Sequence, residues 1–190
     1  MRSLVIWLPA PRSGSGADVF TARLAHCLEK AGHKPVLQWF DRRLELFPSL
    51  LKRLRVPESV DLIHANSWQG FAFKRPGVPL VVTEHHSSLH PLLRAYHSRA
   101  QAIYHRYCVW RWNRLSYEAA DAVVAVSRFC AEPLPAAAGN RLRIISNGVD
   151  TAHFRPGEDG QTASPHKPFR LLFVGNPSRR KGADLLAPLA

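Results

Sequence analysis

The chain has little cysteine and no long hydrophobic run, and each absence excludes a class of protein. Its three cysteines, Cys27, Cys108 and Cys130, are odd in number and form no C-x-x-C spacing, which excludes a disulfide framework or a zinc site built on that motif. No stretch approaches the roughly 18 apolar residues of a membrane-spanning helix. The apolar run near the N-terminus precedes no A-x-A-like cleavage site. We therefore expect a cytoplasmic protein that does not cross a membrane.

Acidic residues are also scarce. Asp and Glu number 14 against 26 Lys and Arg, so the net charge is +12 and the isoelectric point is near 10.5. Such a charge favours contact with phosphates, nucleic acid or anionic lipid. The sequence contains neither an RNP-type aromatic motif nor a helix-turn-helix signature, so we expect no nucleic-acid partner.

Short apolar runs recur along the chain and are separated by helical or loop patterns. The runs occupy residues 4–9, 34–40, 60–65, 78–85, 122–127 and 141–148. Between the first two, Phe20, Leu24, Cys27, Leu28 and Ala31 recur at helical spacing, and Gly32 can end that helix in the left-handed conformation. A long helical stretch is predicted from about residue 89 to residue 120. This alternation predicts an α/β fold with a doubly wound, Rossmann-like parallel sheet.

Polar residues and glycines follow the predicted strands, where such sheets bind their ligands. In chain order they are Gly14, Gly16, His64, Asn66, Glu84, His85, His86, Ser127, Asn147 and Gly148. The glycine loop can approach a phosphate, or it can be an ordinary tight turn. It is not a nicotinamide site, because Val19 occupies the third glycine position of G-x-G-x-x-G.

The last part of the chain differs in composition from the rest. Residues 155–168 are rich in proline, glycine and polar side chains without periodicity, which predicts a linker. An apolar run then leads to Gly175, followed by a basic loop and the first turns of a helix. We expect one domain over residues 1–154 and the start of a second over 169–190.

These motifs together resemble family 4 (group 1) glycosyltransferases of the GT-B fold. The resemblance rests on the segments SGSGADVFTARLAHCLEKAGHKP, DLIHANS, VPLVVTEHH, AADAVVAVSRF, RIISNGVDTAHFRPG and LLFVGNPSRRKGADLL, which occur in the order seen in that family. It implies an N-terminal acceptor-side domain and a truncated donor-binding domain. Asn176 replaces the family's usual arginine, and the family's paired glutamates fall beyond residue 190. We therefore expect no transferase activity from this chain alone.

The resemblance also implies roles for the strand-end residues. His85 matches the family's histidine that positions the acceptor hydroxyl, while the leaving phosphate of a retaining reaction acts as the base. The residues assigned to the donor phosphates are Gly14, Gly16, Arg179, Arg180 and Lys181. The residues assigned to the acceptor are His64, Asn66, Glu84, His86 and Ser127. The implied partners are a nucleotide-sugar donor and a carbohydrate or lipid-linked acceptor.

Alternatives remain open for several of these residues. His85 can be a structural hydrogen-bonding residue, His86 can take its role, and Lys181 can be a solvated surface charge. No H-E-x-x-H or comparable spacing supports a metal, so we expect neither a metal nor another cofactor. The whole chain can also be a non-catalytic binding module, or one half of a split enzyme that pairs with a separate donor-domain chain.

A basic stretch rich in aromatic residues predicts a further partner. No acidic residue lies between His85 and Tyr117, where five arginines alternate with tyrosines and tryptophans, and the segment LFPSLLKRLRV repeats this character. Basic amphipathic helices with aromatic residues at their boundary suit an anionic membrane surface. We expect either peripheral association with the inner face of the membrane or an ordinary solvated helix face.

Overall fold

The computed structural model describes residues 2–134, 136–155, 172–175 and 177–189. They fall into two units, Met1–Asn147 and Gly148–Ala190, each of which is described by itself. The predicted linker at residues 155–168 lies outside the described residues apart from Arg155, and so does Asn176. The predicted domain bounds at 154 and 169 remain predictions.

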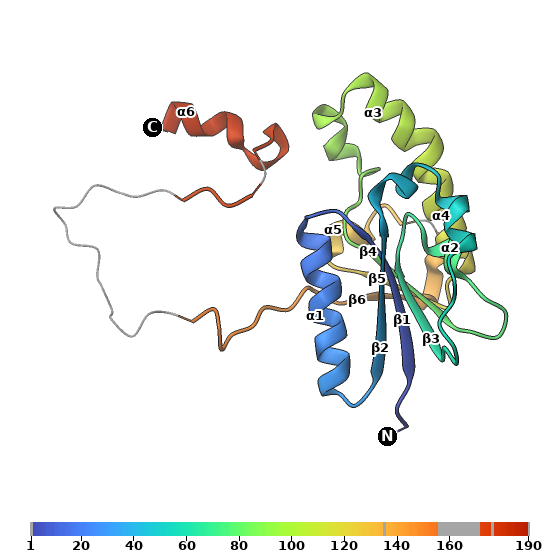
Figure 1. Cartoon of the computed structure of the whole chain (residues 1–190). Coiled ribbons are helices and arrows are strands. Elements are labelled where there is room, and N and C mark those ends of the chain that lie inside the picture. The colour runs from blue at the N-terminus through green and yellow to red at the C-terminus, as the bar shows by residue number, and fades with distance from the viewer. Residues whose placement is uncertain (1, 135, 156–171, 176, 190) are drawn as a thin grey trace. The chain divides into compact units, whose positions relative to one another are not determined.

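The first unit is built on a six-stranded sheet (Figure 1). Its strands are β1 (Val5–Arg12), β2 (Lys34–Asp41), β3 (Leu62–Asn66), β4 (Leu80–Glu84), β5 (Ala122–Ala125) and β6 (Leu142–Ile144). The order is β2-β1-β3-β4-β5-β6, and every neighbouring pair is parallel. The predicted α/β class and the doubly wound parallel sheet are confirmed, because all six apolar runs contain strands.

Helices cover both faces of the sheet. Helix α1 (Gly16–Lys30) packs on β1 and β2 from one side, and α2 (Gly70–Phe73) and α4 (Trp110–Ala119) lie on the other (Figure 1). The other short elements of this unit are α3 (Arg99–Tyr104), α5 (Arg128–Ala131), the π-helical turn His105–Val109, and 3₁₀ turns at Arg42–Leu46, Pro48–Arg53, Pro91–Tyr96 and Ala136–Arg141. The turns His105–Val109 and Ala136–Arg141 contact α4.

The main core lies between the sheet and the α2–α4 layer. Trp7, Ile63, Leu80, Val82 and Val123 point to this side and are fully buried. Burying such side chains stabilises a fold by about 1.5–3 kcal/mol each. This core fixes the positions of β1, β3, β4 and β5, and therefore of the residues at their carboxyl ends.

Helix α1 follows the predicted pattern in most respects. Ser15 caps it by accepting a hydrogen bond from the amide of Ala17, at 3.3 Å, and Gly32 follows its end with φ +86°. The prediction for Gly32 is confirmed. The predicted apolar stripe is wrong at Cys27 and Ala31, which are exposed.

The helix predicted from about residue 89 to 120 is not continuous. A 3₁₀ turn ends at Tyr96, His97 is extended, and the regular helix begins only after Ser98. Ser98 and Gln101 form a capping box, in which each side chain accepts a hydrogen bond from the other residue's amide, so the chain starts a new helix here. The segment LFPSLLKRLRV likewise forms 3₁₀ turns instead of an amphipathic α-helix, since Pro48 interrupts it.

The second unit has little regular structure among its described residues. Residues 172–175, predicted to be part of a strand, are not in one, because no described strand of this unit pairs with them. Two 3₁₀ turns, Arg179–Lys181 and Ala183–Leu185, lead into the short α6 (Leu186–Leu189). Leu172 and Val174 remain more than four-fifths exposed.

Candidate functional site

The candidate site lies at the carboxyl ends of the parallel strands, and β4 divides it in two. Successive side chains of a strand point to opposite faces of a sheet. Glu84 ends β4 and bonds to Tyr117 of α4, whereas the ring of the next residue, His85, packs against Phe20 of α1. Glu84 and His85 were predicted to serve one site, yet their side chains lie on different sides of the sheet.

On the α1 side, two histidines are held in an enclosed, apolar setting. The ring of His85 meets Phe20 edge to face, with centroids 4.3 Å apart, and a ring nitrogen of His64 lies 2.6 Å from Thr83 Oγ1. Burial lowers the pKa of His85 to about 4, and burial with the neighbouring His85 lowers that of His64 to about 4. Both imidazoles are therefore neutral at pH 7.

His85 retains an unused hydrogen-bonding atom. Its Nε2 is buried and has no hydrogen-bond partner among the described residues. A buried polar atom without a partner costs about 1–3 kcal/mol. A ligand group that reached this atom and formed a hydrogen bond would remove that cost. A neutral imidazole nitrogen can accept or donate such a bond, according to its tautomer.

His64 and Asn66 line a much tighter space. They border a cavity of about 10 Å³ beneath α1, together with Phe20 and Leu24. Such a volume holds at most about one water molecule. The predicted acceptor roles of His64 and Asn66 remain predictions, and the bond to Thr83 already uses one ring nitrogen of His64.

The glycine loop is hydrogen-bonded to the carboxylate of Asp18, in the first turn of α1. Asp18 accepts hydrogen bonds from the amides of Ser13 and Gly14, each at 2.9 Å, and from Ser13 Oγ at 2.5 Å. Burial acts to raise the pKa of Asp18, but the bonds from Ser13, Gly14 and Ser15 outweigh it and hold that pKa below its ordinary value. A phosphate at Gly14 would have to displace this carboxylate. The open space beside Gly16 leaves its predicted phosphate role untested.

On the α4 side, a carboxyl group is buried with neutral partners. The Tyr117 hydroxyl donates to Glu84 Oε2, the amide of His86 donates to Oε1 at 3.1 Å, and Asn113 Nδ2 lies 3.5 Å from Oε2. Burial raises the pKa of Glu84, and hydrogen bonds from Tyr117, Ser67 and His86 only partly offset it. The group therefore favours its neutral form more than an exposed glutamate does.

Ser127 acts as a helix cap. Its hydroxyl accepts a hydrogen bond from the amide of Cys130, at 3.1 Å, and so satisfies a free amide at the start of α5. The predicted acceptor role of Ser127 is not tested by this contact. His86 contributes to the Glu84 cluster through its backbone.

Sequence reasoning missed four residues near this edge. Asn113 and Tyr117 face Glu84 from α4, and the buried Gln69 donates to Glu45 Oε1 at 2.8 Å. Burial raises the pKa of Glu45, Gln69 and Arg42 lower it, and Asp18 raises it further. The spacing of Asn113 and Tyr117, four residues apart, was a usable signal because such residues share one helix face.

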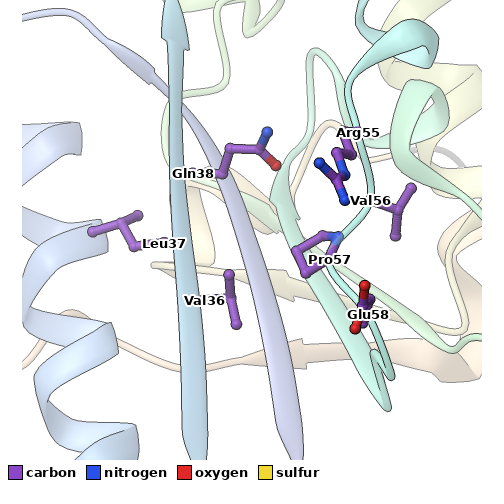
Figure 2. Close-up of a pocket in the computed structure, with 7 residues that line it drawn as sticks. All are labelled: Val36, Leu37, Gln38, Arg55, Val56, Pro57 and Glu58. Carbon is purple, nitrogen blue, oxygen red and sulfur yellow. The ribbon is translucent and has the colours of Figure 1, made fainter.

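Another cavity lies away from these groups. It measures about 360 Å³ and is bounded by β2 and residues 55–58. Figure 2 shows Val36 and Gln38 on the side of residues 55–58, while Leu37 points away from them. Gln38 Oε1 already accepts a hydrogen bond from Trp7 Nε1 at 2.8 Å. None of the predicted site residues lines this cavity.

The predicted donor-phosphate cations lie in the second unit. Arg179, Arg180 and Lys181 form one exposed 3₁₀ turn, and Arg179 Nε lies 3.8 Å from Asp184. The left-handed Gly182, with φ +77°, follows the turn. Their phosphate role remains a prediction. Within the described residues, no three His, Cys, Asp or Glu side chains gather as a metal site would require.

Comparisons with known proteins agree with this fold. Residues 35–153 match the model of the family described as Glycosyltransferase Family 4. The chain is 30% identical to an alpha-maltose-1-phosphate synthase of Mycolicibacterium smegmatis, over 82% of its own length and 43% of that protein's. It is 32% identical to a D-inositol 3-phosphate glycosyltransferase of Catenulispora acidiphila, over 70% and 34% of the two lengths. The chain thus spans less than half of either relative, and it belongs to glycosyltransferase family 4.

Proposed function

We propose that this chain supplies the acceptor side of a glycosyltransferase. The enzyme moves a sugar from a nucleotide-sugar donor to a hydroxyl of a carbohydrate or lipid-linked acceptor, with retention at the reacting carbon. Membership of glycosyltransferase family 4 supports the reaction class. By name, the two relatives are an alpha-maltose-1-phosphate synthase and a D-inositol 3-phosphate glycosyltransferase.

One observation supports a catalytic role for His85 above the rest. Its Nε2 is buried, neutral at pH 7 and without a partner among the described residues, next to the carboxyl end of β4. In the proposed reaction this atom holds the acceptor hydroxyl in line with the sugar's reactive carbon. The leaving phosphate takes the proton, because an imidazole with a pKa near 4 is a weak base at neutral pH.

The donor side supplies positive charge. Arg179, Arg180 and Lys181 bind the diphosphate and stabilise the charge that develops as the glycosidic bond breaks. Gly14 contributes its amide only if Asp18 moves away from it, whereas Asp18 accepts no hydrogen bond from Gly16. The reaction uses no metal, since these cations neutralise the phosphates.

The test is sugar transfer by the chain extended with its downstream sequence or with a relative's donor domain. Nucleotide sugars are supplied in parallel, with membrane extract and soluble sugars as acceptors. His85→Ala should lower kcat about 10²-fold, because misplacing the reacting hydroxyl has effects of that order. His26→Ala, on the exposed side of α1, is the matched control. No transfer by a well-folded extended protein would instead favour a non-catalytic binding module.

We also infer that the enzyme binds the inner face of an anionic membrane. Large side chains that are about half exposed or more include Leu46, Phe47, Tyr96, Ile103 and Tyr107. Exposed cations accompany them at Arg42, Arg43, Lys52, Arg53, Arg94, Arg99, Arg106 and Arg111. Among the described residues no helix is long and apolar enough to span a bilayer, so the proposed contact is with the membrane surface.

Vesicle binding separates this proposal from a solvated surface. The 190-residue chain should sediment with phosphatidylglycerol vesicles and stay in solution with phosphatidylcholine. Phe47→Ser and Arg106→Gln should each weaken binding about fivefold, since one well-placed cation contributes on the order of 1 kcal/mol. Val19→Ser removes a half-exposed apolar side chain from α1 and should change nothing. Equal loss with Val19→Ser would contradict the proposal.

A further inference from the structure

A partly enclosed cavity adjoins Glu84 on the α4 side of the sheet. It measures about 90 Å³, and its polar wall includes Glu84, Ser87 and Asn113. The other lining residues are Leu89, Trp110, Arg114, Tyr117, Pro133 and Leu134. Glu84, Ser87 and Asn113 are each no more than 5% exposed. At about 30 Å³ per water molecule in the liquid, the cavity has room for a small polar group.

Asn113, one of the residues that line the cavity, has a hydrogen-bond acceptor that the protein does not use. Asn113 Oδ1 is buried and has no hydrogen-bond partner among the described residues, while Nδ2 of the same side chain faces Glu84. An unsatisfied buried acceptor destabilises the folded state. The neighbouring Glu84 already has Tyr117 and the His86 amide as donors. Asn113 Oδ1 therefore needs one further hydrogen-bond donor.

The surroundings favour a neutral donor over a cation. The Arg114 guanidinium lies at the cavity wall and stacks on Trp110, with Cζ 5.6 Å from the ring centroid. An ammonium group would be repelled by it and by the net charge of +12. A hydroxyl donates the missing bond without that cost.

The apolar walls indicate what carries the hydroxyl. Trp110 is half exposed at the cavity, and Leu89, Pro133 and Leu134 complete the lining. An aromatic plane beside a single buried acceptor suits a hydroxylated ring, whose C–H face packs on the indole while one hydroxyl enters the cavity. A phosphate brings negative charge and mainly acceptor oxygens, which the carboxyl of Glu84 and Asn113 Oδ1 disfavour.

We propose that this cavity is a binding subsite for a neutral sugar or cyclic polyol, whose hydroxyl donates to Asn113 Oδ1 while its ring lies against Trp110. The subsite adds to the proposed function and rests on it in one respect, because we take the bound ring to be part of the acceptor. Binding itself requires no donor domain, because every lining residue belongs to the first unit.

The test is ligand binding to the 190-residue chain, measured by saturation-transfer NMR. The ligands are glucose, mannose, myo-inositol and glycerol 3-phosphate. The neutral rings should give signals and the phosphate should not. Asn113→Leu fills the same volume without the acceptor and should weaken binding at least tenfold, because one hydrogen bond is worth about 1.4 kcal/mol. It removes an unsatisfied atom and also the Nδ2 contact with Glu84, so the melting temperature is measured alongside binding to show that the variant is folded. Asn140→Leu, at an exposed asparagine, is the control.

A second variant keeps the test valid if Asn113→Leu fails to fold. Trp110→Ala alters a half-exposed side chain and should weaken binding about threefold or more through lost ring contact. Unchanged binding in both variants, or no signal from any neutral ring, would overturn the proposal and leave a cavity filled by water.

The extended protein separates this proposal from the transferase itself. There Asn113→Leu should raise KM for the acceptor and leave kcat unchanged, whereas His85→Ala lowers kcat. Transfer with an unchanged KM in Asn113→Leu would refute the subsite and keep the transferase. Ring binding that is lost in Asn113→Leu, in a protein without transfer, would support the subsite and refute the transferase.

Discussion

The two sides of the sheet both favour uncharged side chains, but these are bases on one side and an acid on the other. On the α1 side, burial lowers the pKa of His64 and His85 to about 4, so two bases stay neutral. On the α4 side, burial raises the pKa of Glu84, so an acid is pushed toward its neutral form. One cause, the removal of water, suppresses positive charge on one side and negative charge on the other.

This difference indicates how the proposed substrates divide. A carboxyl edge with neutral hydrogen-bonding groups suits the uncharged hydroxyls of an acceptor sugar. The diphosphate of a donor needs cations, and the exposed turn of Arg179, Arg180 and Lys181 in the second unit carries three. The position of each group in its own unit is therefore consistent with the roles that we propose.

The largest expected effect is on the α4 side. Glu84→Ala removes the acceptor of the Tyr117 hydroxyl and of the His86 amide, and should lower the free energy of unfolding by about 3 kcal/mol. Urea unfolding at pH 7 measures it. Glu118→Ala removes an exposed carboxyl from the same helix layer and serves as the control. A loss below about 1 kcal/mol would mean that the buried carboxyl costs as much as its bonds contribute.

On the α1 side, the expected effect depends on pH. A histidine with pKa about 4 when folded and 6.5 when unfolded stabilises the fold fully above pH 6.5. This contribution is lost as pH falls from 6.5 toward 4, because the unfolded chain binds the proton first. From pH 7.5 to pH 5, each of His64 and His85 should account for about 2 kcal/mol of lost stability.

Unfolding by urea at the two pH values tests this difference. In a double variant with His64→Gln and His85→Gln, the free energy of unfolding should depend less on pH, whatever its value at pH 7.5. His26→Gln, at an exposed histidine of α1, should leave the dependence as it is. An equally steep loss in the double variant would show that other groups cause it.

A smaller effect is expected at the edge of β5. Ser127→Ala removes the cap of α5 and should cost about 1 kcal/mol of stability, because the Cys130 amide loses its acceptor. If Ser127 only caps the helix, KM for the acceptor in the extended protein stays unchanged. A rise in KM beyond about threefold would assign the predicted acceptor role to this hydroxyl, since Ala removes little else.

The sheet was predictable because its signals are local. Six apolar runs lie between glycine, proline and polar segments, and each contains a strand. The break at His97 and Ser98 was less visible, although Ser98 with Gln101 is a capping pattern that sequence alone contains. The same holds for Ser15 and Asp18, whose spacing resembles a capping box and places a carboxylate on the glycine loop.

The location of the candidate site was predictable from the sequence, but the contacts among its side chains were not. Its residues follow strands, yet the alternation of side chains separates Glu84 from His85. The pairing of Glu84 with Asn113 and Tyr117 joins residues about thirty positions apart, and no local pattern specifies such contacts. The unpartnered atoms of His85 and Asn113 are visible only once the fold surrounds them.

The smallest expected effect concerns the exposed rim of the α4 cavity. Arg114 Nε lies 2.7 Å from Glu118 Oε1, four residues along α4, and both side chains are about half exposed. Such a pair contributes only about 0.3–0.5 kcal/mol, because water screens it. Glu118→Ala should therefore lower the free energy of unfolding by that amount in low salt and by less in 1 M salt. It should not weaken sugar binding, because Arg114 keeps its place over Trp110. A loss of binding in Glu118→Ala would mean that the ion pair positions Arg114 at the cavity, and the α4 side would then depend on charge after all.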